Sequence, residues 1–384
     1  MVRRLLAVMI ALTLMASGGV ARAAEAPAPG SMLWEFHAGG AIWGSLAWRG
    51  GTLYFGSDDH RVYALDTDSR RVEWTFETGG AVRSRPAIAD GLVFAASDDG
   101  FLYAIDRASG RERWRFDMKA SDLGRRPPSP DTPYYDFLQS SPLVHDGQVF
   151  IGSLSGTLFV VDAATGKLSW SVPTLGAVRS SPLIADGRLY FGSWDDHLYA
   201  VDLQTHKTIW RADTGGIVQS TPAIEQGRVV VGSRSAQLIA YDAATGAEAW
   251  RHDYNGSWVE SSAIPGDGLF YVGSSDALTV SVFAAADGKQ AWSFKTGGWT
   301  WATPTLANGT LYIGSISATP YYVPGVTLQA GFHALDAATG REKWRFTPGP
   351  AQGYVTGGVV GSPVIAGGVV YVGALDGRVY ALKE

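Results

Sequence analysis

Cysteine is absent from the 384-residue chain. No disulfide can form, no thiolate can bind a metal, and no N-terminal cysteine can carry a lipid. The fold must therefore be held together by packing of its apolar side chains. We expect a protein that is not a lipoprotein.

Excess basic charge and metal-binding patterns are also lacking. Lys and Arg number 31 against 36 Asp and Glu, so the formal net charge is −5, and we expect no binding to nucleic acid. The seven histidines have no metal-ligand spacing, which predicts no zinc site. The chain also contains no nucleophile elbow and no phosphate-binding glycine loop.

Three Asp-Asp pairs resemble acidic metal loops. They are Asp58-Asp59, Asp98-Asp99 and Asp195-Asp196. Each pair falls at a repeating hairpin, where Asp commonly bonds the backbone of a turn. We interpret the pairs as turn residues and expect no metal site.

The N-terminus has the pattern of a secretory signal. Two arginines precede an apolar run from Leu5 to Met15, and Ala21-Arg22-Ala23 has the small-x-small pattern of a cleavage site. The apolar run is short for a membrane-spanning helix. We interpret residues 1–23 as a cleavable signal peptide and 24–30 as a disordered lead. The mature protein is expected in the periplasm or outside the cell, without a transmembrane span.

What the sequence does contain is a repeated cassette, most complete at Ala334–Trp344. An Asp is followed four residues later by Gly and four residues after that by Trp. Arg70 and His206 replace the Gly in two copies, and Ala284 replaces the Asp in another. Most intervals between the marking tryptophans are 40 residues. These tryptophans are Trp34, Trp74, Trp114, Trp170, Trp210, Trp250, Trp292 and Trp344.

A period near 40 residues with four strand-like runs per unit is typical of β-propeller blades. Apolar runs and polar–apolar alternation mark the strands of each unit, and Gly-containing turns separate them. In one unit the expected strands are Arg83–Ala89, Leu92–Ala96, Leu102–Asp106 and Glu112–Phe116, from the axis outward. Each indole is a large apolar surface that a single small sheet cannot bury, so neighbouring units must pack together.

The two ends of the repeat array complement each other. The first fragment, Met32–Phe36, contains only a Trp strand, whereas the last, Gly361–Lys383, contains three strands and lacks one. We therefore predict an all-β, eight-bladed propeller over residues 31–384. Its four-stranded antiparallel blades form a ring that the N-terminal strand closes by pairing with the C-terminal blade. A closed ring of this kind is expected to be a monomer.

The motif Ala-x-Asp-x-x-x-Gly-x-x-x-Trp at Ala104–Trp114 and Ala334–Trp344 resembles the tryptophan-docking motif of pyrroloquinoline-quinone (PQQ)-type propeller repeats. This repeat occurs in quinone-dependent dehydrogenases and in propellers that bind no quinone, such as the BamB-like factors of outer-membrane protein assembly. In size, compartment and lack of catalytic motifs the chain is most similar to the BamB-like branch. Those proteins are typically lipoproteins, which this chain without Cys cannot be.

Three long connections are predicted on one face of the disc. Because strands alternate in direction, blade-to-blade links and the hairpins between second and third strands open on the same side. The connections are Lys119–Asp136, Ile316–Ala330 and Pro348–Gly358. Exposed tyrosines on loops of a rigid scaffold favour partner binding. The candidate residues are Tyr134, Tyr135, Tyr321, Tyr322 and Tyr354.

The same face contains the mouth of the central channel. Most of the innermost strands contain a Pro at the same position of the repeat. The residue three positions before this Pro varies from strand to strand, and the eight residues at that position are Trp43, Arg83, Gln139, Arg179, Gln219, Glu260, Trp301 and Val360. The polar members are not required for packing, so we predict that Arg83, Gln139, Arg179, Gln219 and Glu260 contribute to partner binding. Alternatively, the arginines pair with Glu260 and line a water-filled hole.

Two functional hypotheses follow. The first is an exported, non-catalytic scaffold that binds a protein or peptide partner in the cell envelope, without a cofactor. The second, implied by the resemblance, is a PQQ-binding oxidoreductase or quinone sensor using calcium. Arg83 and Arg179 would then bind the quinone carboxylates and Trp301 would stack on its ring. Glu260 is the one acid at the expected metal position, whereas Ca²⁺ prefers six or more oxygen ligands.

Overall fold

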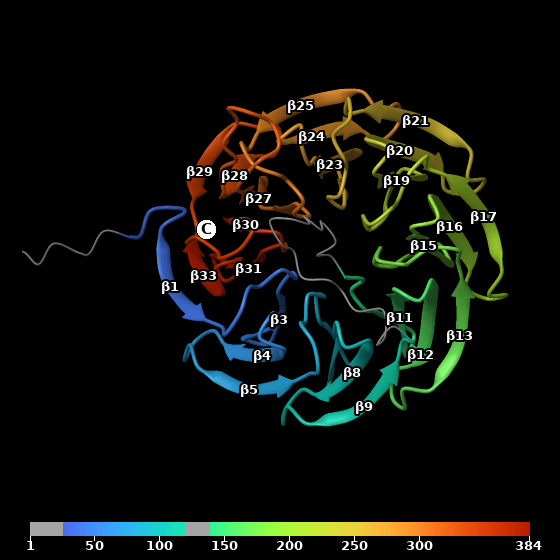
Figure 1. Ribbon diagram of the computed structural model, residues 1–384, viewed down its shortest axis with the longest axis horizontal. Helices are drawn as coiled ribbons and strands as arrows, with labels where there is room; N and C mark the ends of the chain where they lie inside the picture. The colour runs from blue at the N-terminus through green and yellow to red at the C-terminus, as the bar shows by residue number, and fades with distance from the viewer. Residues whose placement is uncertain (1–25, 120–138) are drawn as a thin grey trace, which may run out of the picture.

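Eight antiparallel sheets form a ring around a central axis (Figure 1) in the computed structural model, which describes residues 26–119 and 139–384. We number the sheets as blades 1 to 8. In blades 1 to 6 the last strand lies on the rim of the disc, as the labels of β5, β9 and β13 show. The prediction of an eight-bladed all-β propeller is confirmed.

Blades 1 to 4 each contain four strands in sequence order. From axis to rim, blade 1 consists of β2 (Ala47–Arg49), β3 (Thr52–Ser57), β4 (Arg61–Asp66) and β5 (Val72–Glu77), and blade 2 of β6 (Ala87–Ala89), β7 (Leu92–Ala96), β8 (Phe101–Asp106) and β9 (Glu112–Asp117). Blade 3 consists of β10 (Leu143–His145), β11 (Gln148–Ser153), β12 (Thr157–Asp162) and β13 (Leu168–Pro173), and blade 4 of β14 (Leu183–Ala185), β15 (Arg188–Gly192), β16 (His197–Asp202) and β17 (Thr208–Asp213).

Blades 5 to 7 repeat the pattern, with one extra strand in blade 7. Blade 5 consists of β18 (Ala223–Glu225), β19 (Arg228–Gly232), β20 (Gln237–Asp242) and β21 (Glu248–Asp253), and blade 6 of β22 (Ile264–Gly266), β23 (Leu269–Gly273), β24 (Thr279–Ala284) and β25 (Gln290–Lys295). Blade 7 consists of β26 (Thr305–Ala307), β27 (Thr310–Ala318), β28 (Gly331–Asp336) and β29 (Glu342–Phe346), and β30 (Val355–Gly358) pairs with β27.

Blade 8 joins the two ends of the chain. It contains β31 (Val364–Ala366), β32 (Val369–Gly373), β33 (Arg378–Lys383) and, on the rim, β1 (Met32–His37). β1 runs antiparallel to β33, with Trp34 opposite Ala381 and Phe36 opposite Val379. The N-terminal strand therefore closes the ring, as predicted, and leaves β33 without an unpaired edge.

The innermost strands are shorter than predicted. A strand was expected from Arg83 to Ala89, but β6 covers only Ala87–Ala89. Pro86 has no N–H to donate to a ladder, and Arg85 N donates to Ser141 Oγ of the next blade at 2.9 Å. The segment before each inner strand thus bonds sideways around the axis.

Buried serines continue this sideways bonding. Ser140 Oγ donates to Ser180 O at 3.0 Å, and Ser180 Oγ donates to Ser220 O at 2.8 Å. Each bond joins one blade to the next, 40 residues along the chain. These small side chains near the axis therefore link the blades.

The tryptophan cassette works by docking each indole on the turn of the following blade. Five indole N–H groups donate to a carbonyl there: Trp74 to Arg107 at 2.8 Å, Trp114 to Ala163 at 3.0 Å, Trp210 to Ala243 at 3.2 Å, Trp250 to Ala285 at 2.9 Å and Trp292 to Ala337 at 3.1 Å. The turn Gly lies under the ring. A Cβ on Gly246 would stand 2.6 Å from Trp210, which explains the Gly of the motif.

In the two copies without Gly, the side chain that replaces the Gly contacts the indole. His206 stacks on Trp170 with ring centroids 4.2 Å apart and planes 9° apart, and the Arg70 guanidinium lies 6.0 Å from the Trp34 ring centroid. At the closing seam, a Cβ on Gly30 would stand 2.8 Å from the Trp344 ring. Gly30 N also donates to a backbone carbonyl of β33, at 2.7 Å, so this residue packs with the propeller.

Candidate binding face around the channel mouth

A cavity of about 330 Å³ lies at the axis, where all eight blades contribute to its lining, and we refer to it as the channel cavity. All eight variable inner-strand residues predicted from the sequence line it: Trp43, Arg83, Gln139, Arg179, Gln219, Glu260, Trp301 and Val360. The structure therefore brings these residues together, one from each blade. We refer to them as the inner ring.

A second set of eight residues surrounds the inner ring and was missed by the sequence analysis. Seven of them follow the second strand of a blade and one lies within the extended β27, and each comes directly after a Ser or, in blade 8, an Ala: Asp58, Asp98, Leu154, Trp194, Arg234, Ser275, Ile316 and Leu375. We call these residues the hairpin ring. Their variability within an otherwise regular repeat was the signal that could have identified them.

Arg83 is bound by acids of the hairpin ring. Its Nε and Nη2 donate to the two carboxylate oxygens of Asp58 at 2.7 and 3.0 Å, and its Nη1 lies 3.4 Å from Asp98. Burial alone would lower the pKa of the Arg83 guanidinium, but Asp58 and Asp98 outweigh it and raise that pKa. A bidentate pair of this kind fixes the orientation of the guanidinium.

Glu260 pairs with an arginine of the hairpin ring. Arg234 Nε donates to Glu260 Oε1 at 2.6 Å, and Gln219 Nε2 donates to Oε2. The hairpin residue Arg234, which the sequence analysis did not include, reaches this acid from blade 5, whereas Arg83 pairs with Asp58 and Asp98. Among the described residues Gln219 Oε1 has no donor, although the side chain is only 5% exposed.

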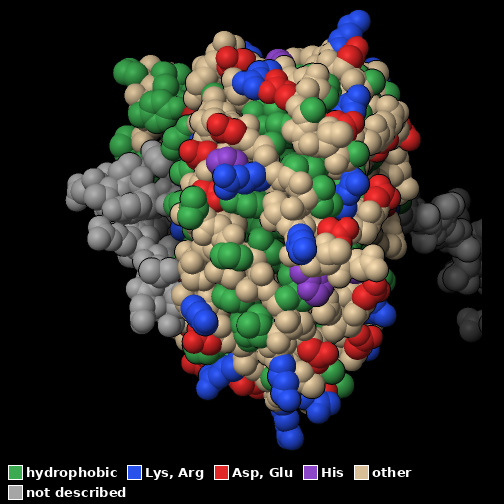
Figure 2. Space-filling model, turned by 90° about the vertical axis from the view of Figure 1, so that its right-hand side faces the viewer, with side chains coloured by type: hydrophobic (Ala, Val, Ile, Leu, Met, Phe, Trp, Pro, Cys, Tyr) green, Lys and Arg blue, Asp and Glu red, His purple; other side chains and the backbone are tan. Residues whose placement is uncertain are grey.

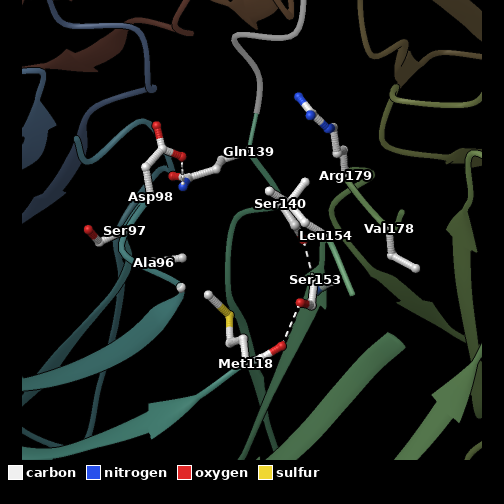
Figure 3. Close-up of a pocket in the computed structure, with 12 residues that line it drawn as sticks. Ala96, Ser97, Asp98, Met118, Gln139, Ser140, Ser153, Leu154, Val178 and Arg179 are labelled. Carbon is white, nitrogen blue, oxygen red and sulfur yellow. Dashed lines mark hydrogen bonds between the residues drawn. The ribbon is translucent and has the colours of Figure 1, made fainter. Parts of the chain in front are cut away.

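A small pocket between blades 2 and 3 lies beside this polar network (Figure 3). Gln139 Nε2 donates to Asp98, and Ser153 Oγ donates to Met118 O at 2.7 Å, while Arg179 points away from Met118. The pocket holds about 30 Å³, which is room for about one water molecule. Of these two spaces, only the larger channel cavity can accommodate a ligand group.

Two of the three Asp-Asp pairs have divided roles, so their interpretation as turn residues is half right for these two, whereas in the third pair Asp195 accepts from Leu175 N and the Tyr199 hydroxyl, as a turn residue does. Asp59 accepts hydrogen bonds from Gly39 N and the Tyr63 hydroxyl, and Asp99 does the same for Gly79 N and Tyr103. These second members serve the turns, as predicted. Asp58 and Asp98, the first members, bind inner-ring side chains instead.

The opposite side of the mouth is apolar. Ile316 and Leu375 of the hairpin ring cluster with Trp43, Trp301 and Val360 of the inner ring. Polar side chains from blades 2 to 6 therefore face an apolar wall formed by blades 7, 8 and 1. Seen from the rim (Figure 2), charges of both signs are interspersed, while hydrophobic side chains project together at the upper left, on one face of the disc.

The two described long connections fold together over this wall. β27 extends to Ala318, and its end pairs with β30, with Ile316 opposite Gly358. Loops were expected both at the end of β27 and at β30. The hairpin and the interblade link thus lie side by side, while the third connection, with Tyr134 and Tyr135, falls outside the described residues.

The remaining candidate tyrosines differ in exposure. Tyr322 is 60% exposed, and the Tyr321 hydroxyl donates to Asp276 Oδ1 at 3.1 Å. Tyr354 is only 6% exposed, with its ring centroid 6.2 Å from that of Trp299. The expectation that Tyr354 is an exposed recognition residue is wrong, because pairing of β30 with β27 turns it into the apolar cluster.

The inner ring does not fit the quinone set implied by the resemblance. Arg83 is engaged by Asp58 and Asp98, and Arg179 stands 4.3 Å from the Trp194 ring centroid. The two acids compensate the positive charge of Arg83, which a quinone carboxylate would require. Within residues 26–119 and 139–384, no group of three or more His, Asp or Glu side chains could hold a metal ion.

No helix in the described part of the chain has the length and apolarity to cross a membrane.

Comparison with known proteins gives one family and several similar structures. The family model described as outer membrane protein assembly factor BamB, of the PQQ-like repeat type, matches residues 17–137, 131–216, 195–315 and 279–384. No curated protein matches the chain.

Solved structures share the fold at low sequence identity. BamB from Moraxella catarrhalis is 21% identical with a TM-score of 0.62, covering 74% of this chain and 86% of its own. The computationally designed Ika8 protein is 17% identical with a TM-score of 0.70, over 92% and 100% of the two chains. A europium-containing methanol dehydrogenase is 15% identical with a TM-score of 0.68, over 89% and 84%. The repeated family match spans nearly the whole chain, which therefore belongs to the BamB-type family of PQQ-like β-propeller proteins.

Proposed function

We propose that this protein is an exported, non-catalytic scaffold that binds a protein or peptide partner in the cell envelope through the face around the channel mouth. The observation that carries the proposal is the division of that mouth into an apolar wall and a polar, charge-paired wall. An extended peptide with one apolar and one polar side complements such a surface. The pattern of the N-terminus supports export, and the ring needs no second copy to close.

The charged residues of the mouth favour binding over catalysis. Arg83 and Glu260 are both engaged by residues of the hairpin ring. Groups held in place by such pairs are preorganised, which lowers the entropic cost of ordering them when a partner binds. The family description also suggests the partner, so we include in the proposal a role in the assembly of outer-membrane proteins.

Capture of the partner from a cell-envelope extract tests the proposal. Tyr321→Ala with Tyr322→Ala removes two side chains at the apolar wall, whereas Leu168→Ala with Ile209→Ala removes two rim side chains that are 51% and 42% exposed. We expect the mouth variant to lose the captured partner and the rim variant to keep it. Retention by the mouth variant, or loss by the rim variant, would contradict the proposed face.

The quinone alternative has its own test. Purified protein is titrated with PQQ and calcium while the melting temperature and dye reduction are followed. The proposed function predicts no saturable shift and no reduction. A saturable rise of the melting temperature together with dye reduction would replace the scaffold with an oxidoreductase.

A further inference from the structure

A second cavity of about 200 Å³ lies next to the channel mouth. Its walls include three tryptophans, one tyrosine and one acid: Trp258, Trp299, Trp301, Tyr322 and Asp276. Trp301 also lines the channel cavity, so this residue is a wall shared by the two spaces. We call the smaller one the aromatic pocket.

The indoles of the aromatic pocket are held in fixed positions. Trp299 and Trp301 stack with ring centroids 5.0 Å apart and planes 8° apart. Trp301 Nε1 donates to Ser275 Oγ at 3.0 Å, and Trp299 Nε1 donates to Asp276 Oδ1 at 2.8 Å. A pocket built from such locked rings does not have to order its walls when a ligand enters.

Asp276 gives the aromatic pocket its charge. The Trp299 indole and the Tyr321 hydroxyl both donate to its Oδ1, at 2.8 and 3.1 Å. These donors orient the carboxylate and leave its negative charge in place. Asp276 is the only charged side chain among the described residues that line the pocket.

Trp258 already takes part in a cation–π contact. The Arg234 guanidinium stands 4.5 Å from its ring centroid, and the charge of Arg234 is compensated by Glu260 at 2.6 Å. A cation in the pocket would therefore share the Trp258 ring with an arginine whose charge is already paired. The acid nearest to it would be Asp276, which lines the same pocket. Aromatic walls with one carboxylate are suited to a desolvated organic cation.

We propose that the aromatic pocket binds the ammonium group of a lysine side chain presented by the peptide partner. A guanidinium would require two acceptor oxygens in a fork, whereas Asp276 Oδ1 is already occupied by two donors. A lysine ammonium is a point charge on an apolar stem, and the stem would lie against the rings. This inference rests on the proposed function for the source of the lysine, but the site can be tested without the partner.

The probe is the capped tripeptide acetyl-Ala-Lys-Ala-amide, and its control contains norleucine in place of lysine. Binding is followed by two-dimensional nuclear magnetic resonance of the indole N–H signals, with the Trp258 signal assigned through Trp258→Phe. We expect the lysine probe to shift the signals of Trp258 and Trp299 saturably. The norleucine probe should not. No shift with lysine, or equal binding of both probes, would overturn the proposal.

Variants separate the charge of the pocket from its shape. Asp276→Asn keeps an acceptor for Trp299 and Tyr321 and should weaken lysine binding at least about tenfold. Asp287→Asn removes the same charge from an exposed turn at the opposite end of blade 6 and should leave binding unchanged. Equal affinities of the two variants would contradict a role for Asp276.

Tyr322 provides a measurement that does not depend on a buried residue. Because the side chain is 60% exposed, Tyr322→Ala should fold normally and weaken the lysine probe severalfold. Leu168→Ala, which removes an exposed side chain from the rim, should bind the probe like the wild type. If the probe binds but no partner is captured, the site stands and the proposed function fails. If a partner is captured but the probe does not bind, this inference fails and the proposed function stands.

Discussion

Arg234 of blade 5 donates from Nε to Glu260 Oε1 of blade 6 at 2.6 Å, across the boundary between two sheets. The Glu260 side chain is 4% exposed and that of Arg234 is 15% exposed. This buried pair joins the hairpin ring to the inner ring. It shows how the repeat places two variable residues from neighbouring blades in contact at the mouth.

Removing Arg234 should destabilise the protein, because Glu260 would remain buried without its cation. We expect Arg234→Ala to lower the free energy of unfolding by about 3–5 kcal/mol. The matched control is Arg113→Ala, since Arg113 pairs with Asp106 at 3.0 Å but its side chain is 62% exposed. Its cost should stay below about 1 kcal/mol. Denaturant titrations of both variants measure the difference, and equal costs would mean that the buried pair does not stabilise the fold.

Turn glycines under the docked indoles should tolerate substitution less than other turn glycines. Gly246 has a φ of +72° and lies under Trp210, whereas Gly227 has a φ of +71° and a Cβ added there would meet no atom within 4 Å. Both alanine variants carry the strain of a left-handed backbone, about 1–2 kcal/mol. Gly246→Ala should cost at least about 1 kcal/mol more, as measured by thermal unfolding. A Gly227→Ala variant that is equally destabilised would show that docking does not require the Gly.

The indole N–H should contribute to the stability of the fold at Trp114 but not at Trp170. Trp114 Nε1 donates to Ala163 O at 3.0 Å, whereas Trp170 Nε1 has no acceptor in the described part of the chain. Replacing either Trp by Phe removes similar ring area, but only Trp114→Phe loses a hydrogen bond. We expect it to cost about 1 kcal/mol more than Trp170→Phe. The reverse order in denaturant midpoints would refute this role of the indole nitrogen.

The sequence predicted those features that repeat. Blade number, closure by β1 and the positions of the docked indoles all follow from the period of the Asp-Gly-Trp cassette, because each repeat must bury the same indole. The inner ring could also be predicted, since one variable residue stood out against constant small neighbours. Arg70 and His206 were recognised as departures from the cassette, although their contacts with Trp34 and Trp170 became visible only in the fold.

The contacts between repeats could not be predicted. Asp58 reaches Arg83 of the next blade, and Arg234 reaches Glu260, because the sheets are wedged together at a specific angle that no single repeat encodes. Pairing of β27 with β30 likewise joins two insertions from different positions in the chain. That pairing buries Tyr354, which the loop pattern alone indicated as exposed.

His333 should make the stability of the propeller sensitive to acid. It is 1% exposed, and burial lowers its pKa below the ordinary value of 6.5, even though Glu342 lies 2.7 Å from Nδ1 and acts in the opposite direction. The unfolded chain therefore binds a proton at a higher pH than the native protein. The free energy of unfolding should fall as the pH drops below about 6.5 towards the native pKa.

A variant isolates this contribution of His333. His252, whose pKa is also lowered by burial, adds a slope of the same sign, so His333→Gln should reduce the pH dependence between about pH 7 and 5 without abolishing it. The readout is the slope of the free energy of unfolding against pH, which does not depend on how stable the variant is at neutral pH. An unchanged slope would exclude His333 as the source.

Site-specific photo-crosslinking tests the central claim most directly. A benzophenone amino acid replaces Tyr322 at the mouth in one protein and Ile209 on the rim in another, two positions that are 60% and 42% exposed. After irradiation in intact cells, a partner that docks on the mouth should be captured at position 322 and not at position 209. Capture at position 209 alone, or equal capture at both positions, would contradict a binding face around the channel mouth.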